Sequence, residues 1–547
     1  MEDQAFASRV RQQLTTAEFV MLRWETELTP CTGITAVSKQ ERRNFRHGVT
    51  VAPWCGQLRR KADADKPLAN GSVRRTGWRW RVAGKSCEVL ATTDTSLPPI
   101  FYLDVEGRFT GRATPYDVEP ESPENDRVAT LKRDALYFGL AVERLLIETG
   151  CTSQFVWGAD WETVPALIRV RPRHLIALTL HNTFDECFEK QAGEFADEYG
   201  ALLEQRPMTG ETRTALEVGL DQADVVTTVN RGFSRGMRSE PLQREIMLSH
   251  IPWHLIDRVV GIDNAAFSPL NADLAALSGR LERDFPMGCQ ELFARKATAR
   301  GRLATQGILA AGKVMVVIMG RRSAQKQHDV VVETVRQLFH ERPELPLYMV
   351  FATTPEEGGQ PRLEQMKQLA AEYPQRVACF DGRINFFGDL MAGADYNCMP
   401  SLYEPHGGAY DGLVVPIARA VDGLAEQICP LDPGPEAAAI AAIWHAASED
   451  PTGLLFREPA SCTTTPVADL RALLDISPSP RNALFEGMVE ALKATLIVAI
   501  ELRTRRWESY AALVRAALRR QQESSWIANL GGMMALIEQA RGRRPFS

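Results

Sequence analysis

The hydrophobic positions of this chain follow two patterns that alternate along much of its length. Short continuous apolar runs, such as residues 155–157, 175–180 and 225–229, are typical of buried parallel strands. Between such runs lie stretches with apolar residues three and four positions apart, as in residues 127–149, and these predict amphipathic helices. Because parallel strands need helical crossovers, the alternation predicts an α/β fold.

A turn-rich segment near residues 251–269 interrupts the alternation, and a second strand and helix series follows it, beginning with the apolar run 314–319. A chain of 547 residues is too long for one typical domain. We predict two Rossmann-like domains that face each other across a cleft, residues 1–255 and 256–490, with C-terminal helices over residues 491–547. A cleft between two such sheets is a usual place for a substrate site.

Composition and charge exclude several classes of protein. A net charge of −6 and a pI near 6.0 argue against bulk electrostatic binding of nucleic acid or of an anionic membrane. No apolar run reaches the length of a transmembrane helix, and the acidic residues 1–4 lack the order of a signal peptide. The ten cysteines include no C-x-x-C pair, which favours reduced thiols in a cytoplasmic protein. We therefore expect no membrane insertion and no nucleic-acid partner.

The segment M-P-S-L-Y-E-P-H-G-G, residues 399–408, follows a predicted buried strand. Ligands of doubly wound folds bind at the carboxyl ends of the strands. Gly407 and Gly408 let the backbone approach a ligand, and free N–H groups at a following helix start can hold phosphate oxygens. Glu404 can accept hydrogen bonds from sugar hydroxyls. The alternative is an ordinary strand-to-helix turn with a solvated glutamate.

Other polar residues also fall at predicted strand ends. Singly, each of them has an ordinary structural explanation, such as a helix cap or a solvated helix start. Together they form a coherent set, because cations at a helix start suit a diphosphate while carboxylate and imidazole groups suit sugar hydroxyls. The set is Asp160, His181, Arg321, Lys326 and Glu404.

The order of these motifs resembles the bacterial glycogen synthase and plant starch synthase family, which are retaining glycosyltransferases of the two-Rossmann-domain GT-B fold. Seven segments match in order over roughly residues 130–430. They are 156–161 (family H-D-W), 180–182 (T-I-H-N), 223–229 (A-D-x-V-T-T-V-S), 261–269 (G-I-D…N-P), 320–326 (S-R-L-T-x-Q-K-G), 392–405 (A-G-A-D…M-P-S-x-F-E-P-C-G) and 422–425 (T-G-G-L-A).

The resemblance implies a role for each matched residue. Arg321 and Lys326 would hold the nucleotide diphosphate and stabilise the departing nucleoside diphosphate. Glu404 would lie near the transferred sugar, with the backbone of Gly407 and Gly408 facing its hydroxyls or the phosphate. His181 and Asp160 would contact the sugar from the N-terminal domain. Retention would follow a front-face attack in which the leaving phosphate takes the proton of the acceptor.

The chain also departs from the family pattern. The family loop K-T-G-G-L corresponds to Cys31, Thr32, Gly33 and Ile34, so the lysine of that loop is missing. Thr32 and Gly33 remain candidate donor-binding residues, as does His406, which replaces the family cysteine. The histidine ahead of Asp160 has no counterpart, and the segment between Glu404 and Gly423 is shorter than in the family. Residues 40–125 show almost none of the family pattern, which leaves the acceptor open.

We predict a retaining transferase that moves glucose from ADP-glucose or UDP-glucose to an α-glucan chain or to a smaller acceptor. No cofactor and no metal is expected, since no D-x-D pair follows a strand in the predicted cleft. One rival is a catalytically impaired homologue that binds glucan or a partner protein, which the missing lysine favours. Another, a dinucleotide-dependent oxidoreductase, lacks the expected G-x-G-x-x-G after a strand. The nucleotide base, the acceptor and the oligomeric state are not predicted.

Overall fold

The computed structural model divides into two compact units. Unit 1 comprises Met1–Val229, Met247–Phe267 and Trp526–Ser547, and unit 2 comprises Asn230–Ile246 and Ser268–Ser525. This division differs from the predicted ranges 1–255, 256–490 and 491–547 at three places. Residues 230–246 belong to unit 2, while residues 256–267 and 526–547 belong to unit 1. The structure describes residues 2–28, 33–55, 66–109, 115–116, 127–266, 270–356, 358–408, 410, 412–431, 450–459, 462 and 467–543.

The described residues of unit 1 form a nine-stranded sheet in the order β3-β4-β5-β2-β1-β6-β7-β8-β9. Strand β1 pairs in parallel with β2 on one side and with β6 on the other, and β3 and β4 add an antiparallel hairpin. The strands are β1 (Phe19–Leu22), β2 (Gly48–Pro53), β3 (Val73–Val82), β4 (Lys85–Thr92), β5 (Ile100–Val105), β6 (Phe155–Ala159), β7 (Leu175–Leu180), β8 (Val225–Thr228) and β9 (Val260–Gly261).

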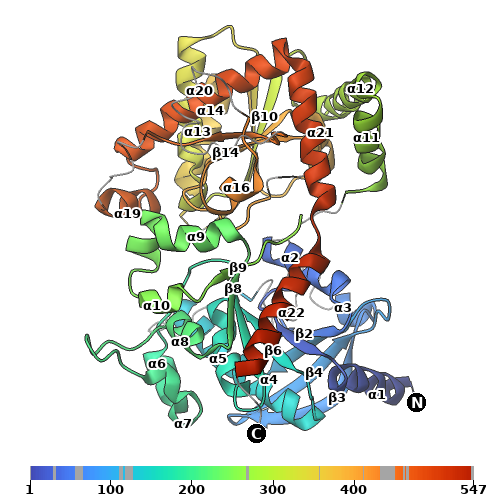
Figure 1. Cartoon of the computed structure of the whole chain (residues 1–547), viewed down its shortest axis with the longest axis vertical. Coiled ribbons are helices and arrows are strands. Elements are labelled where there is room, and N and C mark those ends of the chain that lie inside the picture. Colours follow the sequence, from blue (N-terminus) through green and yellow to red (C-terminus); the bar gives the residue numbers. More distant parts are fainter. Residues whose placement is uncertain are drawn as a thin grey trace. The chain divides into compact units, whose positions relative to one another are not determined.

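Helices connect and cover these strands. They are α1 (Glu2–Thr15), α2 (Gly33–Asn44), α3 (Lys66–Ala69), α4 (Arg127–Thr149), α5 (Asp160–Val170), α6 (Glu189–Ala192), α7 (Ala196–Tyr199), α8 (Ala215–Gln222), α10 (Trp253–Ile256) and α22 (Trp526–Arg543). The last of them, drawn in red in Figure 1, packs against β7 and β8. Its Trp526, Met533 and Ile537 join one apolar cluster with Phe19 and Trp157, which explains why this helix belongs to unit 1.

The described residues of unit 2 form a six-stranded parallel sheet in the order β12-β11-β10-β13-β14-β15. Strand β10 carries the apolar run V-M-V-V-I-M, whose first five residues are buried, as a strand covered on both faces requires. The strands are β10 (Val314–Arg321), β11 (Leu347–Thr354), β12 (Val377–Asp381), β13 (Tyr396–Met399), β14 (Val415–Arg419) and β15 (Leu454–Phe456).

The helices of unit 2 bury one large apolar cluster against this sheet. Helix α20 packs on α13 and on β10, and contributes Met488, Leu492 and Leu496 to the cluster. The helices are α9 (Arg231–Ser239), α11 (Ala272–Arg283), α12 (Phe285–Ala304), α13 (His328–Glu341), α14 (Gln360–Glu372), α15 (Phe387–Gly393), α16 (Asp422–Gln427), α19 (Val467–Asp475), α20 (Ala483–Arg505) and α21 (Trp507–Glu523). The predicted α/β class with two largely parallel sheets is confirmed.

The cysteines of the described ranges are free thiols. None of the helices in the described ranges combines the length and the apolar composition that crossing a bilayer requires.

Candidate functional site

A pocket opens in unit 2 at the carboxyl ends of the neighbouring strands β10 and β13. From β10 the chain continues to β11 and β12 on one side of the sheet, while β13, β14 and β15 extend on the other side. The pocket therefore lies at the topological switch point, where doubly wound folds bind their ligands. It is lined by Ile318, Met319, Gly320, Lys326, Asn397, Cys398, Met399, Pro400, Ser401, Glu404 and Gly408.

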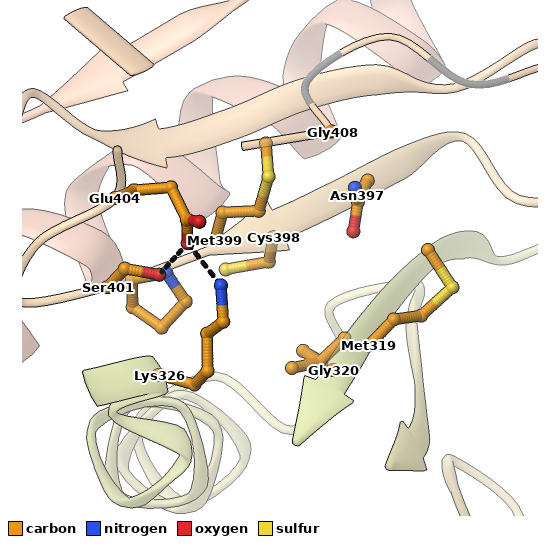
Figure 2. A pocket seen from close by; sticks show the side chains of 11 residues that line it. Met319, Gly320, Lys326, Asn397, Cys398, Met399, Ser401, Glu404 and Gly408 are labelled. Carbon is orange, nitrogen blue, oxygen red and sulfur yellow. Dashed lines mark hydrogen bonds and ion pairs between the residues drawn. The ribbon is translucent and has the colours of Figure 1, made fainter. Parts of the chain in front are cut away.

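Two of the predicted site residues meet in this pocket. Lys326 ends the short 3-10 turn Ala324–Lys326 after β10, and Glu404 lies in the loop after β13. The Lys326 ammonium donates a hydrogen bond to Oε2 of Glu404, and the Ser401 hydroxyl donates another to the same oxygen over 3.0 Å (Figure 2). The cation and the carboxylate therefore neutralise each other at the mouth of the pocket, where both side chains remain partly accessible.

Asp422 holds the backbone of Glu404, a role that the sequence did not predict. Its Oδ2 accepts a hydrogen bond of 3.0 Å from the Glu404 N–H, while the Gly423 N–H donates to the Glu404 carbonyl over 3.0 Å. Asp422 is buried with a φ of 41°, a left-handed conformation that costs energy outside glycine. Burial, reinforced by nearby Glu240, raises the pKa of Asp422 well above its usual value. The only sequence signal was an aspartate within the segment matched to T-G-G-L-A.

Two glycines of α9 make room for Asp422. A Cβ atom added to Gly236 would lie 2.0 Å from Oδ1 of Asp422, and one added to Gly232 would lie 2.3 Å from its carbonyl oxygen. Both distances are far below van der Waals contact. Helix α9 therefore packs directly against the start of α16, which explains why Asn230–Ile246 belongs to unit 2.

Arg321 lies at the end of β10, but it is not among the lining residues of the described pocket. Its Nη1 donates to Oε1 of Glu356 over 2.8 Å, and 48% of its side chain is exposed. The next residue, Arg322, is buried and donates to Asp381 over 2.7 Å. The structure thus places Lys326 in the pocket and Arg321 beside it, paired with a different carboxylate.

The predicted helix start after Gly408 is wrong. The described residues between Glu404 and β14 form turns and irregular backbone, and the next helix is α16, beyond β14. Gly407 and Gly412 both have a φ of 67°, which a right-handed helix does not permit. Gly408 lines the pocket, whereas His406 is buried and its Nδ1 lies 2.7 Å from Nε2 of Gln427. This segment offers a pocket wall rather than a helix terminus for phosphate.

In unit 1 the structure brings Asp160 and His181 together. Asp160 begins α5 directly after β6, and His181 follows β7. Oδ1 of Asp160 accepts hydrogen bonds from the N–H groups of His181, over 2.7 Å, and Asn182, over 3.3 Å. Nδ1 of His181 lies 3.2 Å from Oδ2 of Asp160, outside hydrogen-bond geometry. The carboxylate therefore fixes the loop that carries the imidazole, and Asp160 holds a φ of 58° to do so.

A second carboxyl group lies beside Asp160 and was not singled out by the sequence. Glu162 is buried, and its Oε1 accepts a hydrogen bond of 3.0 Å from the Tyr116 hydroxyl. Burial, reinforced by the charge of Asp160, raises the pKa of Glu162 to about 8. The predicted first-loop residue Thr32 lies outside the described residues, and Gly33 begins α2.

The sequence is 29% identical over 305 residues to a glycogen synthase of Bordetella petrii, a match that covers 50% of this chain and 53% of that protein. It is 24% identical over 380 residues to a glycogen synthase of Lactococcus lactis, covering 65% and 72% of the two proteins. The chain is a divergent relative of the glycogen and starch synthases. It spans about half the length of the Bordetella protein. No family model matches the sequence.

This synthase relative also has the fold expected from that resemblance. The catalytic domain of starch synthase IV from Arabidopsis thaliana, bound to ADP and acarbose, has a TM-score of 0.66 at 15% identity and covers 96% of this chain and 100% of its own. A UDP-forming trehalose-phosphate synthase from Burkholderia xenovorans has a TM-score of 0.53 at 11% identity, covering 95% of this chain and 100% of its own. The predicted GT-B fold is confirmed.

Proposed function

We propose that this protein is a retaining glycosyltransferase that moves glucose from ADP-glucose or UDP-glucose to an α-glucan chain. The observation that carries the proposal is the Lys326–Glu404 pair in a pocket at the topological switch point of unit 2. The glycogen synthase relatives supply the reaction class, and the ADP and acarbose bound to starch synthase IV supply the chemistry of donor and acceptor.

In the proposed reaction the acceptor hydroxyl attacks C1 of glucose on the face from which the nucleoside diphosphate leaves. The bond between C1 and the phosphate oxygen breaks, a bond between C1 and the acceptor oxygen forms, and the acceptor proton passes to the leaving phosphate oxygen. Charge builds up on that phosphate, so the main task of the protein is electrostatic stabilisation. Lys326 performs it by exchanging Glu404 for a phosphate oxygen.

The other predicted residues have roles that remain proposals. Arg321 would leave Glu356 for the diphosphate, and Glu404, released from Lys326, would accept a hydrogen bond from a sugar hydroxyl. His181, held by Asp160, would contact the transferred sugar, while Thr32 and Gly33 would contribute to donor binding. No resident cofactor or metal ion is part of the proposal. We also propose a cytoplasmic location, in keeping with the free cysteines of the described ranges.

Binding of nucleoside diphosphates tests this proposal before any turnover assay. ADP or UDP should raise the unfolding temperature of the protein, and Lys326→Ala should weaken that binding about tenfold or more, because charged hydrogen bonds to phosphate are strong. Arg302→Ala removes a cation from an exposed ion pair with Asp389 in the same unit and serves as the control. Stabilisation by maltooligosaccharide but by neither diphosphate would instead favour a glucan-binding protein without a donor site.

A further inference from the structure

Asn397 is a buried polar residue on the floor of the pocket. It is the second residue of β13 and lies opposite Val317 of β10. Only 4% of the residue is exposed, and its amide oxygen Oδ1 has no hydrogen-bond partner among the residues that the structure describes. Figure 2 shows its side chain on β13, near Met319 and Gly320 of β10. A strand inside a parallel sheet normally carries apolar residues at such positions.

The other polar side chains of the pocket differ from Asn397 because they already have partners. Lys326 and Ser401 both donate to the same oxygen of Glu404, which links these three side chains to one another. Ile318, Met319, Cys398, Met399 and Pro400 supply apolar walls. The Asn397 oxygen is therefore a buried acceptor in a largely apolar part of the pocket, and no described residue donates to it. Such a group costs free energy unless a ligand supplies the missing donor.

We propose that Oδ1 of Asn397 accepts a hydrogen bond from a hydroxyl group of the transferred sugar and thereby selects the donor substrate. This inference rests on the proposed function and names a specificity-determining residue within it. The diphosphate is not the partner of this oxygen, because phosphate oxygens at neutral pH are themselves acceptors. A sugar hydroxyl is a donor, and a site built to bond a hydroxyl rejects analogues that lack it.

Gly320 contributes to the same floor. Its φ of 118° lies in a region that favours glycine, and no side chain projects from it toward Asn397. A Cβ atom added to Gly320 would lie 3.7 Å from Cε of Lys326, so the missing side chain leaves room beside the Lys326 stem.

The test compares ligand affinities rather than turnover. Isothermal titration calorimetry measures the Kd of the nucleoside diphosphate, of its glucose conjugate, and of conjugates of 2-, 3-, 4- and 6-deoxyglucose. Asn397→Leu should raise the Kd of the glucose conjugate about tenfold, because one hydrogen bond to the sugar is lost. The Kd of the diphosphate should change by no more than about twofold. One deoxyglucose conjugate should bind the wild-type protein about tenfold more weakly than the glucose conjugate does. The same two conjugates should bind the Asn397→Leu variant with equal affinity.

Tyr396→Phe is the matched control, because Tyr396 precedes Asn397 in β13 and donates to the Ala499 carbonyl of α20, over 2.7 Å. That variant should be less stable than the wild type, but the ratio of its Kd values for the diphosphate and the glucose conjugate should stay unchanged. Asn397→Ala is measured in parallel, so that misfolding of the leucine variant does not decide the outcome. If the Asn397 variants lost affinity for the diphosphate and the glucose conjugate equally, or if the ratio of the two Kd values stayed unchanged, this inference would be overturned while the proposed function would stand. A wild-type protein that binds no nucleotide sugar would overturn the proposed function with it.

Discussion

Lys326 donates a hydrogen bond to Glu404 in the pocket of the free protein. The family resemblance implies that Lys326 contacts the diphosphate and that Glu404 contacts the transferred sugar, so each residue occupies the place of the other's ligand. An ion pair of this kind holds both side chains in place until a ligand replaces one partner. A phosphate oxygen can replace Glu404 on the cation, and a sugar hydroxyl can then donate to the freed carboxylate. Donor binding and rearrangement of this pair are therefore expected to be one event.

Removing either member of the pair should nearly abolish turnover. Lys326→Ala and Glu404→Ala should each lower kcat by about 10²–10³, the usual effect of losing one preorganised electrostatic contact. Lys326→Arg should recover part of the loss because it restores the charge. Release of nucleoside diphosphate is the readout, and Arg302→Ala should match the wild type. Wild-type turnover in both alanine variants, with intact folding, would remove these residues from the mechanism.

Arg321 should contribute less than Lys326, and its partner Glu356 should oppose donor binding. Half of the Arg321 side chain is exposed, so solvent weakens its interactions, and it must leave Glu356 to reach a phosphate. We expect Arg321→Ala to weaken binding of the nucleoside diphosphate and Glu356→Gln to strengthen it by a few fold. Titration calorimetry at low salt measures both effects. Weaker binding after Glu356→Gln would show that the carboxylate orients Arg321 rather than competing for it.

Burial of Glu162 predicts a pH-dependent stability for unit 1. Its pKa is raised to about 8, so the folded state favours the protonated form. Its contribution to stability is fully present below about pH 4.5 and is lost as the pH rises through 8. The unfolding free energy of Glu162→Gln relative to the wild type should therefore rise between pH 4.5 and 8 and stay constant above. Denaturant unfolding measures this difference, and the exposed Glu538→Gln should show no such trend.

The predictable features are those encoded locally. Continuous apolar runs identified β7 and β10, because both faces of a buried parallel strand need such residues. Lys326 and Glu404 were identified because each follows a strand, and strand ends meet at one edge of a sheet. By contrast, the roles of Asp422 and Asn397 depend on tertiary contacts that no local pattern encodes. The glycines after Glu404 were misjudged because the same residues suit a helix start and a left-handed turn.

Close packing between α9 and Asp422 makes Gly236 sensitive to substitution. An added methyl group in Gly236→Ala would collide with Oδ1 of Asp422, and the expected destabilisation is about 1–3 kcal/mol. Turnover should fall as well, since Asp422 holds the Glu404 N–H. Gly301→Ala in α12 is the matched control, because its added Cβ meets no atom of the described residues within 4 Å. A helical alanine stabilises by about 0.5–1 kcal/mol relative to glycine. Equal stability of the two variants would contradict the packing described for α9.

A donor screen measures the transfer of glucose from a nucleotide sugar without any intermediate assumption. Purified protein is incubated with ADP-glucose, UDP-glucose and other nucleotide sugars, with and without maltooligosaccharide, and release of the diphosphate is followed. We expect release from one glucose donor that depends on the oligosaccharide and lengthens it, and that Lys326→Ala lowers by about 10²–10³. Release that ignores maltooligosaccharide would contradict the glucan acceptor. No release from any donor by the folded protein would contradict the assignment as a glucosyltransferase.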